Sequence, residues 1–194
     1  MTVATTLTLL RLLLIIPIAT LVLHHGNGVA ALVLFIIAAA TDYFDGFVAR
    51  RFNQVTALGA RLDASVDKFF IYALLAALLS VGLYLVVLVA AAFSRDLVVE
   101  FFRQRAAAKD RVIPANRWGK TKFSLQCLSI GVALIAHSLP NPATWYVIAN
   151  VVLAAAVIAS IPGAVIVWRV GQTVTSKSGY EPSLIVRPSE LLDP

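Results

Sequence analysis

The sequence predicts an all-α, polytopic membrane protein with six transmembrane helices and with both termini in the cytoplasm. Of its 194 residues 60% are hydrophobic and only 13% are charged, and the mean hydropathy is +0.87. This is more apolar surface than a soluble domain of this size needs. Six apolar runs follow one another along the chain, and the basic residues gather at alternate connections between them. These three observations carry the prediction.

Each apolar run is long enough to cross a bilayer with some tilt, since a crossing needs about 20 residues. The runs cover residues 6–24, 28–49, 62–82, 83–102, 120–139 and 143–169. A helix satisfies its backbone hydrogen bonds within one segment, so we expect antiparallel helical hairpins joined by short connections. Residues 1–170 are therefore predicted to form one membrane domain, followed by a polar tail over 171–194.

The distribution of charge gives the orientation. The connections after the first, third and fifth runs are HHGNG, a break near residues 80–82 and HSLPNPAT, and they contain no Lys, Arg, Asp or Glu. All 16 Lys and Arg residues fall on the opposite side. By the positive-inside rule both termini face the cytoplasm, and so does the connection between the second and third runs. The net positive charge is thus explained by the membrane, and we expect no nucleic-acid partner. The single Cys127 excludes an intrachain disulfide.

Four carboxylates stand at the ends of two apolar runs. Asp42 and Asp45 are one helical turn apart at the end of the second run, and Asp63 and Asp67 are one turn apart at the start of the third. Acids at a membrane boundary are costly and by default mark function. Four neighbouring carboxylates repel one another, and Mg²⁺ or Mn²⁺ relieves this repulsion while bridging phosphates. A structural salt-bridge network with neighbouring arginines is the alternative.

Two further residues support a phosphate site. Gly46 shares the helical stripe of the first two acids and lacks the Cβ that would block a ligand. Arg50 follows one turn later, where it can pair with a phosphate. The connection RFNQVTAL is expected at the membrane surface, where a nucleotide head group can sit while lipid tails stay in the bilayer.

This motif resembles the signature of the CDP-alcohol phosphatidyltransferases, which are integral membrane enzymes of phospholipid synthesis. The matching positions are Asp42, Asp45, Gly46, Ala49, Arg50, Gly59, Asp63 and Asp67. The resemblance implies transfer of the phosphatidyl group of CDP-diacylglycerol to an alcohol, with one or two Mg²⁺ or Mn²⁺ ions per active site. It also implies a multi-pass homodimer among the lipids of a cell membrane, expected to be bacterial, with the active site facing the cytoplasm.

The resemblance also implies roles for individual residues. The implied metal ligands are Asp42, Asp45, Asp63 and Asp67. Asp67 is in addition the implied general base. The implied contacts to the CDP-lipid are Asp42, Gly46, Arg50 and Thr56. Members that act on glycerol phosphate usually read Asp-Pro-x-Ala-Asp-Lys where residues 63–68 of this chain read DASVDK, so the acids are kept and the proline is not.

The first run carries a second likeness to the members that act on glycerol phosphate. These often show Asn-x-x-Thr-x-x-Arg, and this chain has Thr5, Thr8 and Arg11, with Thr in place of Asn. Thr8 and Arg11 share a helix face and can contact the diphosphate or the cytidine of the nucleotide. An arginine anchored at the interface, with a threonine as helix cap, is an equally good interpretation.

The fourth run is interrupted by charges. Arg95, Asp96 and Glu100 lie within an otherwise apolar segment. One interpretation is an intramembrane ion pair between Arg95 and either acid. The other is that Arg95 faces a cavity and binds a second anionic group, an interpretation favoured by the Arg-Asp or Arg-Glu that the family often shows here.

Lys120 and Lys122 follow Gly119 at the start of the fifth run, where a helix N-terminus offers N–H groups to a phosphate. With Gln126 they resemble the Gly-Lys-x-Lys-Thr-x-x-Gln segment of the members that act on glycerol phosphate, although Phe123 replaces the threonine. Arg95, Lys120 and Lys122 are therefore expected to bind the phosphate of an acceptor.

The expected reaction is transfer to sn-glycerol 3-phosphate, which releases CMP and forms phosphatidylglycerophosphate. The nearest alternative is a cardiolipin synthase of the same family, with phosphatidylglycerol as acceptor, and inositol phosphate and serine are further alternatives. A cation transporter would scatter its acids through the depth of the membrane. Here the four motif acids lie within about two helical turns of the cytoplasmic side, which disfavours a transporter.

Overall fold

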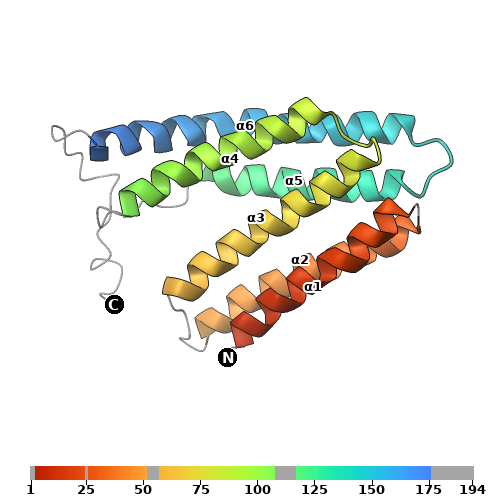
Figure 1. Ribbon diagram of the computed structural model, residues 1–194, viewed down its shortest axis with the longest axis horizontal. Coiled ribbons are helices and arrows are strands. Elements are labelled where there is room, and N and C mark those ends of the chain that lie inside the picture. Colours follow the sequence, from red (N-terminus) through yellow and green to blue (C-terminus); the bar gives the residue numbers. More distant parts are fainter. Residues whose placement is uncertain (1–2, 25, 52–56, 108–116, 176–194) are drawn as a thin grey trace. The chain divides into compact units, whose positions relative to one another are not determined.

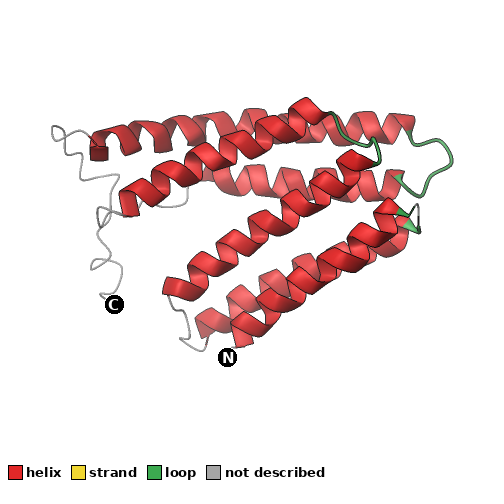
Figure 2. Ribbon diagram, in the orientation of Figure 1, coloured by secondary structure: helices red, strands yellow, loops and turns green. Residues whose placement is uncertain are grey.

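The computed structural model describes residues 3–24, 26–51, 57–107 and 117–175, with the backbone alone in 3–10, 42–51, 57–64 and 170–175. Throughout these ranges the chain forms α-helices and no strand (Figure 2). The helices are α1 Val3–Leu23, α2 Gly28–Arg51, α3 Ala57–Ser80, α4 Val86–Ala107, α5 Arg117–Ala136 and α6 Ala143–Thr175. Each predicted apolar run coincides with one helix, so the all-α prediction is confirmed.

The helix bounds decide where the motif acids lie. The helix α3 begins at Ala57, ahead of the apolar run predicted from residue 62, so Asp63 and Asp67 both lie in its N-terminal half. Asp42 and Asp45 lie in the C-terminal half of α2.

The break predicted near residues 80–82 is present as a helix cap followed by a turn. Gly82 has a φ of 79°, a left-handed conformation that glycine adopts without strain. The amide of Gly82 donates to the carbonyl of Leu79, and the amide of Leu83 donates to that of Leu78, both at 3.0 Å. This pair of bonds is the Schellman motif, which satisfies the last carbonyls of α3 and turns the chain toward α4.

The described chain divides into two compact units, and each is treated by itself. The first comprises residues 1–89 and 127–152, and the second comprises residues 90–126 and 153–194. In the first unit α1 packs against α2 and α3 (Figure 1). The rings of Phe35 and Phe70 stack between α2 and α3 with centroids 6.0 Å apart. The core around them includes Ile18, Val22, Ala31, Ala38, Ile71, Leu74, Leu75 and Leu78.

The beginning of α2 is fixed against the end of α5 within the first unit. The side chain of Asn27 caps α2, since its Oδ1 accepts hydrogen bonds from the amides of Val29 and Ala30 at 2.9 and 3.2 Å. A Cβ added to Gly28 would lie 2.4 Å from the carbonyl oxygen of Leu134. This close approach of two backbones requires glycine.

The half-buried side chain of Asn150 joins the α3–α4 turn to the start of α6. Asn150 accepts from the amide of Leu85 at 3.0 Å and donates to the carbonyls of Leu83 and Tyr146 at 2.9 and 2.8 Å. Its amide therefore satisfies backbone groups that the turn leaves unpaired.

A second contact, which is buried, joins the α3–α4 turn to α5 and α6. Ser129 donates to the carbonyl of Ala149 at 2.7 Å, so the hydroxyl of Tyr84, 2.6 Å from the Ser129 oxygen, is the donor in that contact. Both hydroxyls thus have partners in an apolar interior.

In the second unit α4 packs against α6. Val99 and Ala106 of α4 form a buried cluster with Val167 of α6, and Phe102 and Ala164 pack against it. The guanidinium of Arg105 lies over the ring of Phe101, 5.2 Å from its centroid.

Large apolar side chains are exposed on every helix. Examples are Leu13, Val33, Phe69, Val87, Leu128 and Ile158. Large exposed apolar side chains on every helix are typical of a surface that meets lipid or another protein. Within the described ranges one helical stretch, Ala143–Arg169, is long and apolar enough to span a membrane, and its mean hydropathy is 2.4. The apolar stretches Arg11–Leu23 and Gly28–Thr41 are shorter.

Candidate functional site

The acidic motif lies on α2 and α3, two helices that share α1 as a neighbour. Several predicted site residues fall where the backbone alone is described: Thr8, Asp42, Asp45, Gly46, Arg50 and Asp63. Thr56 lies outside the described residues. Their predicted contacts to metal and CDP-lipid stay predictions. Where side chains are described, no group of three or more metal-ligating residues occurs, and Asp67 is the one motif acid in that part.

Asp67 forms an ion pair with Arg11. The Nη1 of Arg11, on α1, donates to Oδ1 of Asp67, on α3. The side chain of Arg11 is 2% exposed and that of Asp67 is 24% exposed. An unpaired charge in such an environment would be strongly unfavourable, so each residue stabilises the other. The pair also joins two helices of the first unit.

The sequence missed this pair. Arg11 was expected to contact the nucleotide or to anchor the first helix at the interface, and Asp67 was expected to bind a metal ion, with neighbouring arginines as the alternative partners of the motif acids. The available signal was an arginine within an apolar run, which needs a buried partner. The sequence does not say which acid that partner is, because it lies 56 residues away.

The donor set of the acidic motif fits a hard divalent cation. All four candidate ligands are carboxylates, two on α2 and two on α3, spaced one turn apart on each helix. Oxygen ligands of this kind suit Mg²⁺ and Mn²⁺.

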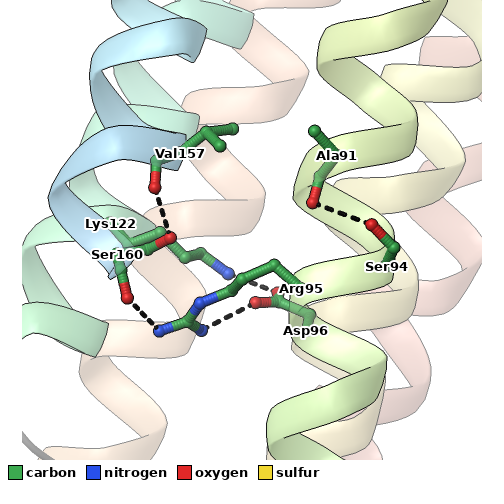
Figure 3. A network of polar contacts seen from close by, with 7 residues as sticks. All are labelled: Ala91, Ser94, Arg95, Asp96, Lys122, Val157 and Ser160. Atoms are coloured by element: carbon green, nitrogen blue, oxygen red, sulfur yellow. Dashed lines mark hydrogen bonds and ion pairs between the residues drawn. The ribbon is translucent and has the colours of Figure 1, made fainter. Parts of the chain in front are cut away.

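A second charged network lies in the second unit, built by α4, α5 and α6 (Figure 3). The Nη1 of Arg95 donates to Oδ1 of Asp96 at 2.9 Å, and the Nζ of Lys122 donates to the other oxygen, Oδ2. The Nη2 of Arg95 donates to the backbone carbonyl of Ser160 at 2.8 Å. Arg95 and Asp96 come from α4, Lys122 from α5 and Ser160 from α6. The ion pair predicted for Arg95 is therefore present.

This network is buried, and two of the three charged side chains that the described contacts join in it are cations. The exposed fractions of the side chains are 7% for Asp96, 11% for Lys122 and 15% for Arg95. One carboxylate thus faces two cations. Among the described residues, neither the buried Nε of Arg95 nor the Nε2 of Gln126, which follows Lys122 by one turn, has a hydrogen-bond partner. Donors outnumber acceptors here, as is typical of an anion site.

The carbonyl of Ser160 accepts the guanidinium of Arg95 from within α6. A backbone carbonyl has two lone pairs, so it can accept a side-chain donor in addition to an amide of its own helix. The proline in α6, Pro162, lacks the N–H that would reach the carbonyl four residues earlier, which is that of Ile158 and not that of Ser160.

The two candidate lysines differ in their surroundings. Lys120 lies in the first turn of α5 and is exposed, whereas Lys122 is buried against Asp96. Residues two apart on a helix point in different directions, so both lysines cannot face the same neighbours. The two acids of α4 differ as well, since Glu100 accepts from Gln104 at 3.2 Å while Asp96 binds Arg95.

Comparison with known proteins adds to this geometry. Residues 1–162 match the family described as CDP-alcohol phosphatidyltransferase. The chain belongs to this family. The resemblance carried by the acidic motif is thus confirmed over most of the sequence, and α1–α5 all fall within the matched range.

Individual relatives have more specific names. A protein of Bacillus subtilis (strain 168) named CDP-diacylglycerol–glycerol-3-phosphate 3-phosphatidyltransferase is 38% identical, over 57% of this chain and 57% of the relative. One of the same name from Mycoplasma pneumoniae is 39% identical, over 55% of this chain and 47% of the relative. A probable phosphatidylglycerophosphate synthase of Mycobacterium tuberculosis (strain H37Rv) is 35% identical, over 81% of this chain and 76% of the relative. The match spans about half the length of the first two relatives.

Proposed function

We propose that this chain transfers the phosphatidyl group of CDP-diacylglycerol to sn-glycerol 3-phosphate, releasing CMP and forming phosphatidylglycerophosphate. Membership of the phosphatidyltransferase family and the names of the relatives support the reaction. The observation that carries the choice of acceptor is the buried network in which Arg95 and Lys122 share the single carboxylate of Asp96. A net positive, donor-rich environment suits an acceptor that carries its own phosphate.

In the proposed reaction Asp67 is the general base. Its carboxylate takes the proton of the acceptor hydroxyl, whose oxygen attacks the β-phosphorus of CDP-diacylglycerol. The bond from that phosphorus to the bridging oxygen breaks, and CMP leaves with this oxygen. Arg11 balances the charge of Asp67 and holds its carboxylate in place from α1. A positioned base of this kind contributes about 10²- to 10⁴-fold to a rate.

The remaining motif residues are assigned to the CDP-lipid and the metal. Mg²⁺ or Mn²⁺, one or two ions held by Asp42, Asp45, Asp63 and Asp67, would stabilise the charge that develops on the phosphates. Arg50 pairs with a phosphate of the nucleotide, and Gly46 leaves room for the ligand beside the acids. Thr8 and Thr56 complete the proposed contacts to the CDP-lipid. Arg95 and Lys122 bind the acceptor phosphate, and Lys120 lies at the solvent-exposed margin of this site, where water screens its charge and makes its contribution small.

We propose further that all six helices cross a bacterial cell membrane in a homodimer, with both termini and the active site on the cytoplasmic side. Two observations support the crossings: large apolar side chains are exposed on every helix, and neither Lys nor Arg occurs in the connections predicted to face outward. Fusions of a periplasm-dependent reporter after residues 26 and 140 should be active, and a fusion after residue 110 should be silent. The reverse pattern would refute this orientation.

The decisive test of function is CMP release by the purified full chain with CDP-diacylglycerol and Mg²⁺ or Mn²⁺. Glycerol 3-phosphate, phosphatidylglycerol, inositol phosphate and serine are supplied separately, and a chelator is used to remove the metal. We expect release with glycerol 3-phosphate alone, and its loss on chelation and in Asp67→Asn. Release with phosphatidylglycerol alone would instead establish the cardiolipin synthase reaction.

A further inference from the structure

Asp96 is the residue that holds the two buried cations of the second unit together. Each of its carboxylate oxygens is used, Oδ1 by Arg95 of the same helix and Oδ2 by Lys122 of α5 (Figure 3). Arg95 is further fixed by the carbonyl of Ser160 on α6. A single carboxylate thereby sets where two long side chains from different helices place their charged ends.

Fixing two long cationic side chains close together is unfavourable without a neighbouring anion. Arg and Lys lose much rotamer freedom when they are fixed, and two buried cations repel each other. Asp96 offsets both costs. We propose that Asp96 is a positioning residue for the acceptor phosphate, holding Arg95 and Lys122 so that one phosphate group accepts hydrogen bonds from both. This inference rests on the proposed function.

The network can still bind an anion after Asp96 has formed its ion pairs. In the described contacts two cations, Arg95 and Lys122, share the one carboxylate of Asp96. In the described part of the chain the buried Nε of Arg95 and Nε2 of Gln126 have no acceptor. A buried donor without an acceptor is unfavourable, and a phosphate oxygen would remove that cost.

A purely structural role for Asp96 leads to a different expectation. If Asp96 only neutralised buried charge, its replacement would lower the stability and the amount of active protein, and the affinity of the active fraction for each substrate would stay the same. A positioning role instead predicts a selective rise in KM for the acceptor. The KM for each substrate therefore separates the two roles.

The experiment measures CMP release by purified full-length protein over a range of glycerol 3-phosphate at saturating CDP-diacylglycerol, and the reverse. In Asp96→Asn the amide NH₂ faces one of the cations, so we expect the KM for glycerol 3-phosphate to rise about tenfold or more. The KM for CDP-diacylglycerol should stay within about twofold. Asp96→Glu keeps the charge but shifts the carboxylate by one methylene, and we expect an intermediate KM in a stably folded protein.

Glu100→Gln is the matched control. It removes the same charge from the same helix one turn later, where the carboxylate accepts from Gln104. Its KM for glycerol 3-phosphate should stay within about twofold of the wild type. Equal KM values in the wild type, Asp96→Asn and Asp96→Glu would overturn the inference and leave the proposed function intact, as would an equal rise in Glu100→Gln.

A second measurement does not depend on the reaction. Inorganic phosphate should raise the Tm of the wild type and of Glu100→Gln, and should have little effect on the Tm of Asp96→Asn. If the wild type released CMP with another acceptor and not with glycerol 3-phosphate, the proposed function would fail. This phosphate shift would still support Asp96 as the organiser of an anion site. Without any shift in the wild type, the inference would fall as well.

Discussion

The two units each hold a carboxylate against cations. In the first, the described side chain of Asp67 pairs with that of Arg11, and we refer to these two residues as the balanced pair. In the second, Asp96 pairs with both Arg95 and Lys122, and we refer to these three residues as the unbalanced cluster. We propose that the carboxylate of the balanced pair acts on a proton and that the two cations of the unbalanced cluster bind an anionic ligand. The same kinds of residue would then serve two roles, according to how many cations one carboxylate holds.

The largest effect is expected at the balanced pair. Asp67→Asn removes the proposed base, and we expect the rate of CMP release to fall about 10²- to 10⁴-fold. The measurement is kcat at saturating concentrations of both substrates, with retained folding checked by thermal unfolding. A variant that kept more than about a tenth of the wild-type kcat would remove Asp67 from the role of base.

The unbalanced cluster should respond in affinity rather than in rate. Lys122→Met removes one buried cation, and we expect the KM for glycerol 3-phosphate to rise about 10- to 100-fold, the value of a charged hydrogen bond. Lys120→Met is the matched control, because Lys120 lies two residues away and is exposed. Its KM should change less than about threefold, since exposed charges are screened by solvent. An equal rise in the KM in Lys120→Met and Lys122→Met would contradict the distinction between the exposed and the buried lysine.

Breaking the balanced pair from its other side tests stability. Arg11→Met leaves Asp67 without this cation, and we expect a loss of about 2 kcal/mol in the free energy of unfolding. This is below the usual cost of breaking a fully buried pair, because Asp67 is 24% exposed. Denaturant unfolding in detergent measures it. Arg11→Lys should lose less, and an unchanged stability in Arg11→Met would show that the pair contributes nothing.

A neutral contact should have the smallest effect. Tyr84→Phe removes the hydroxyl that donates to Ser129, and we expect a loss of about 1 kcal/mol in the free energy of unfolding. Neither KM should change, because the contact carries no charge and belongs to neither network. A changed KM for either substrate would show that packing near the α3–α4 turn reaches one of the sites.

The helices could be predicted from the sequence because apolar runs of sufficient length end at charges or turn residues. The helix bounds were predicted less well. The helix α3 begins before its predicted apolar run, at Ala57, and α4 and α6 end beyond theirs, at Ala107 and Thr175. The acidic motif could be identified from its spacing alone, since residues three and four apart share a helix face.

The partners of the charged side chains could be predicted only in part. The sequence left Arg95 with a choice between Asp96 and Glu100, both within reach on α4. The choice depends on Lys122 and on the carbonyl of Ser160, which reach Asp96 and Arg95 from other helices. The pair of Arg11 with Asp67 likewise depends on how α1 packs against α3. Contacts of this kind arise from tertiary packing, and local spacing does not encode them.

The bond from Arg95 to the Ser160 carbonyl has a consequence for how this molecule can vary. The third helix of the network contributes a main-chain atom, which no exchange of side chain removes. A mutational scan would therefore score position 160 as tolerant of other small residues, although it supports the guanidinium. The sensitivity should instead appear at Arg95, whose guanidinium this carbonyl holds. A backbone atom can thus be needed for a contact even though the side chain of its residue is free to vary.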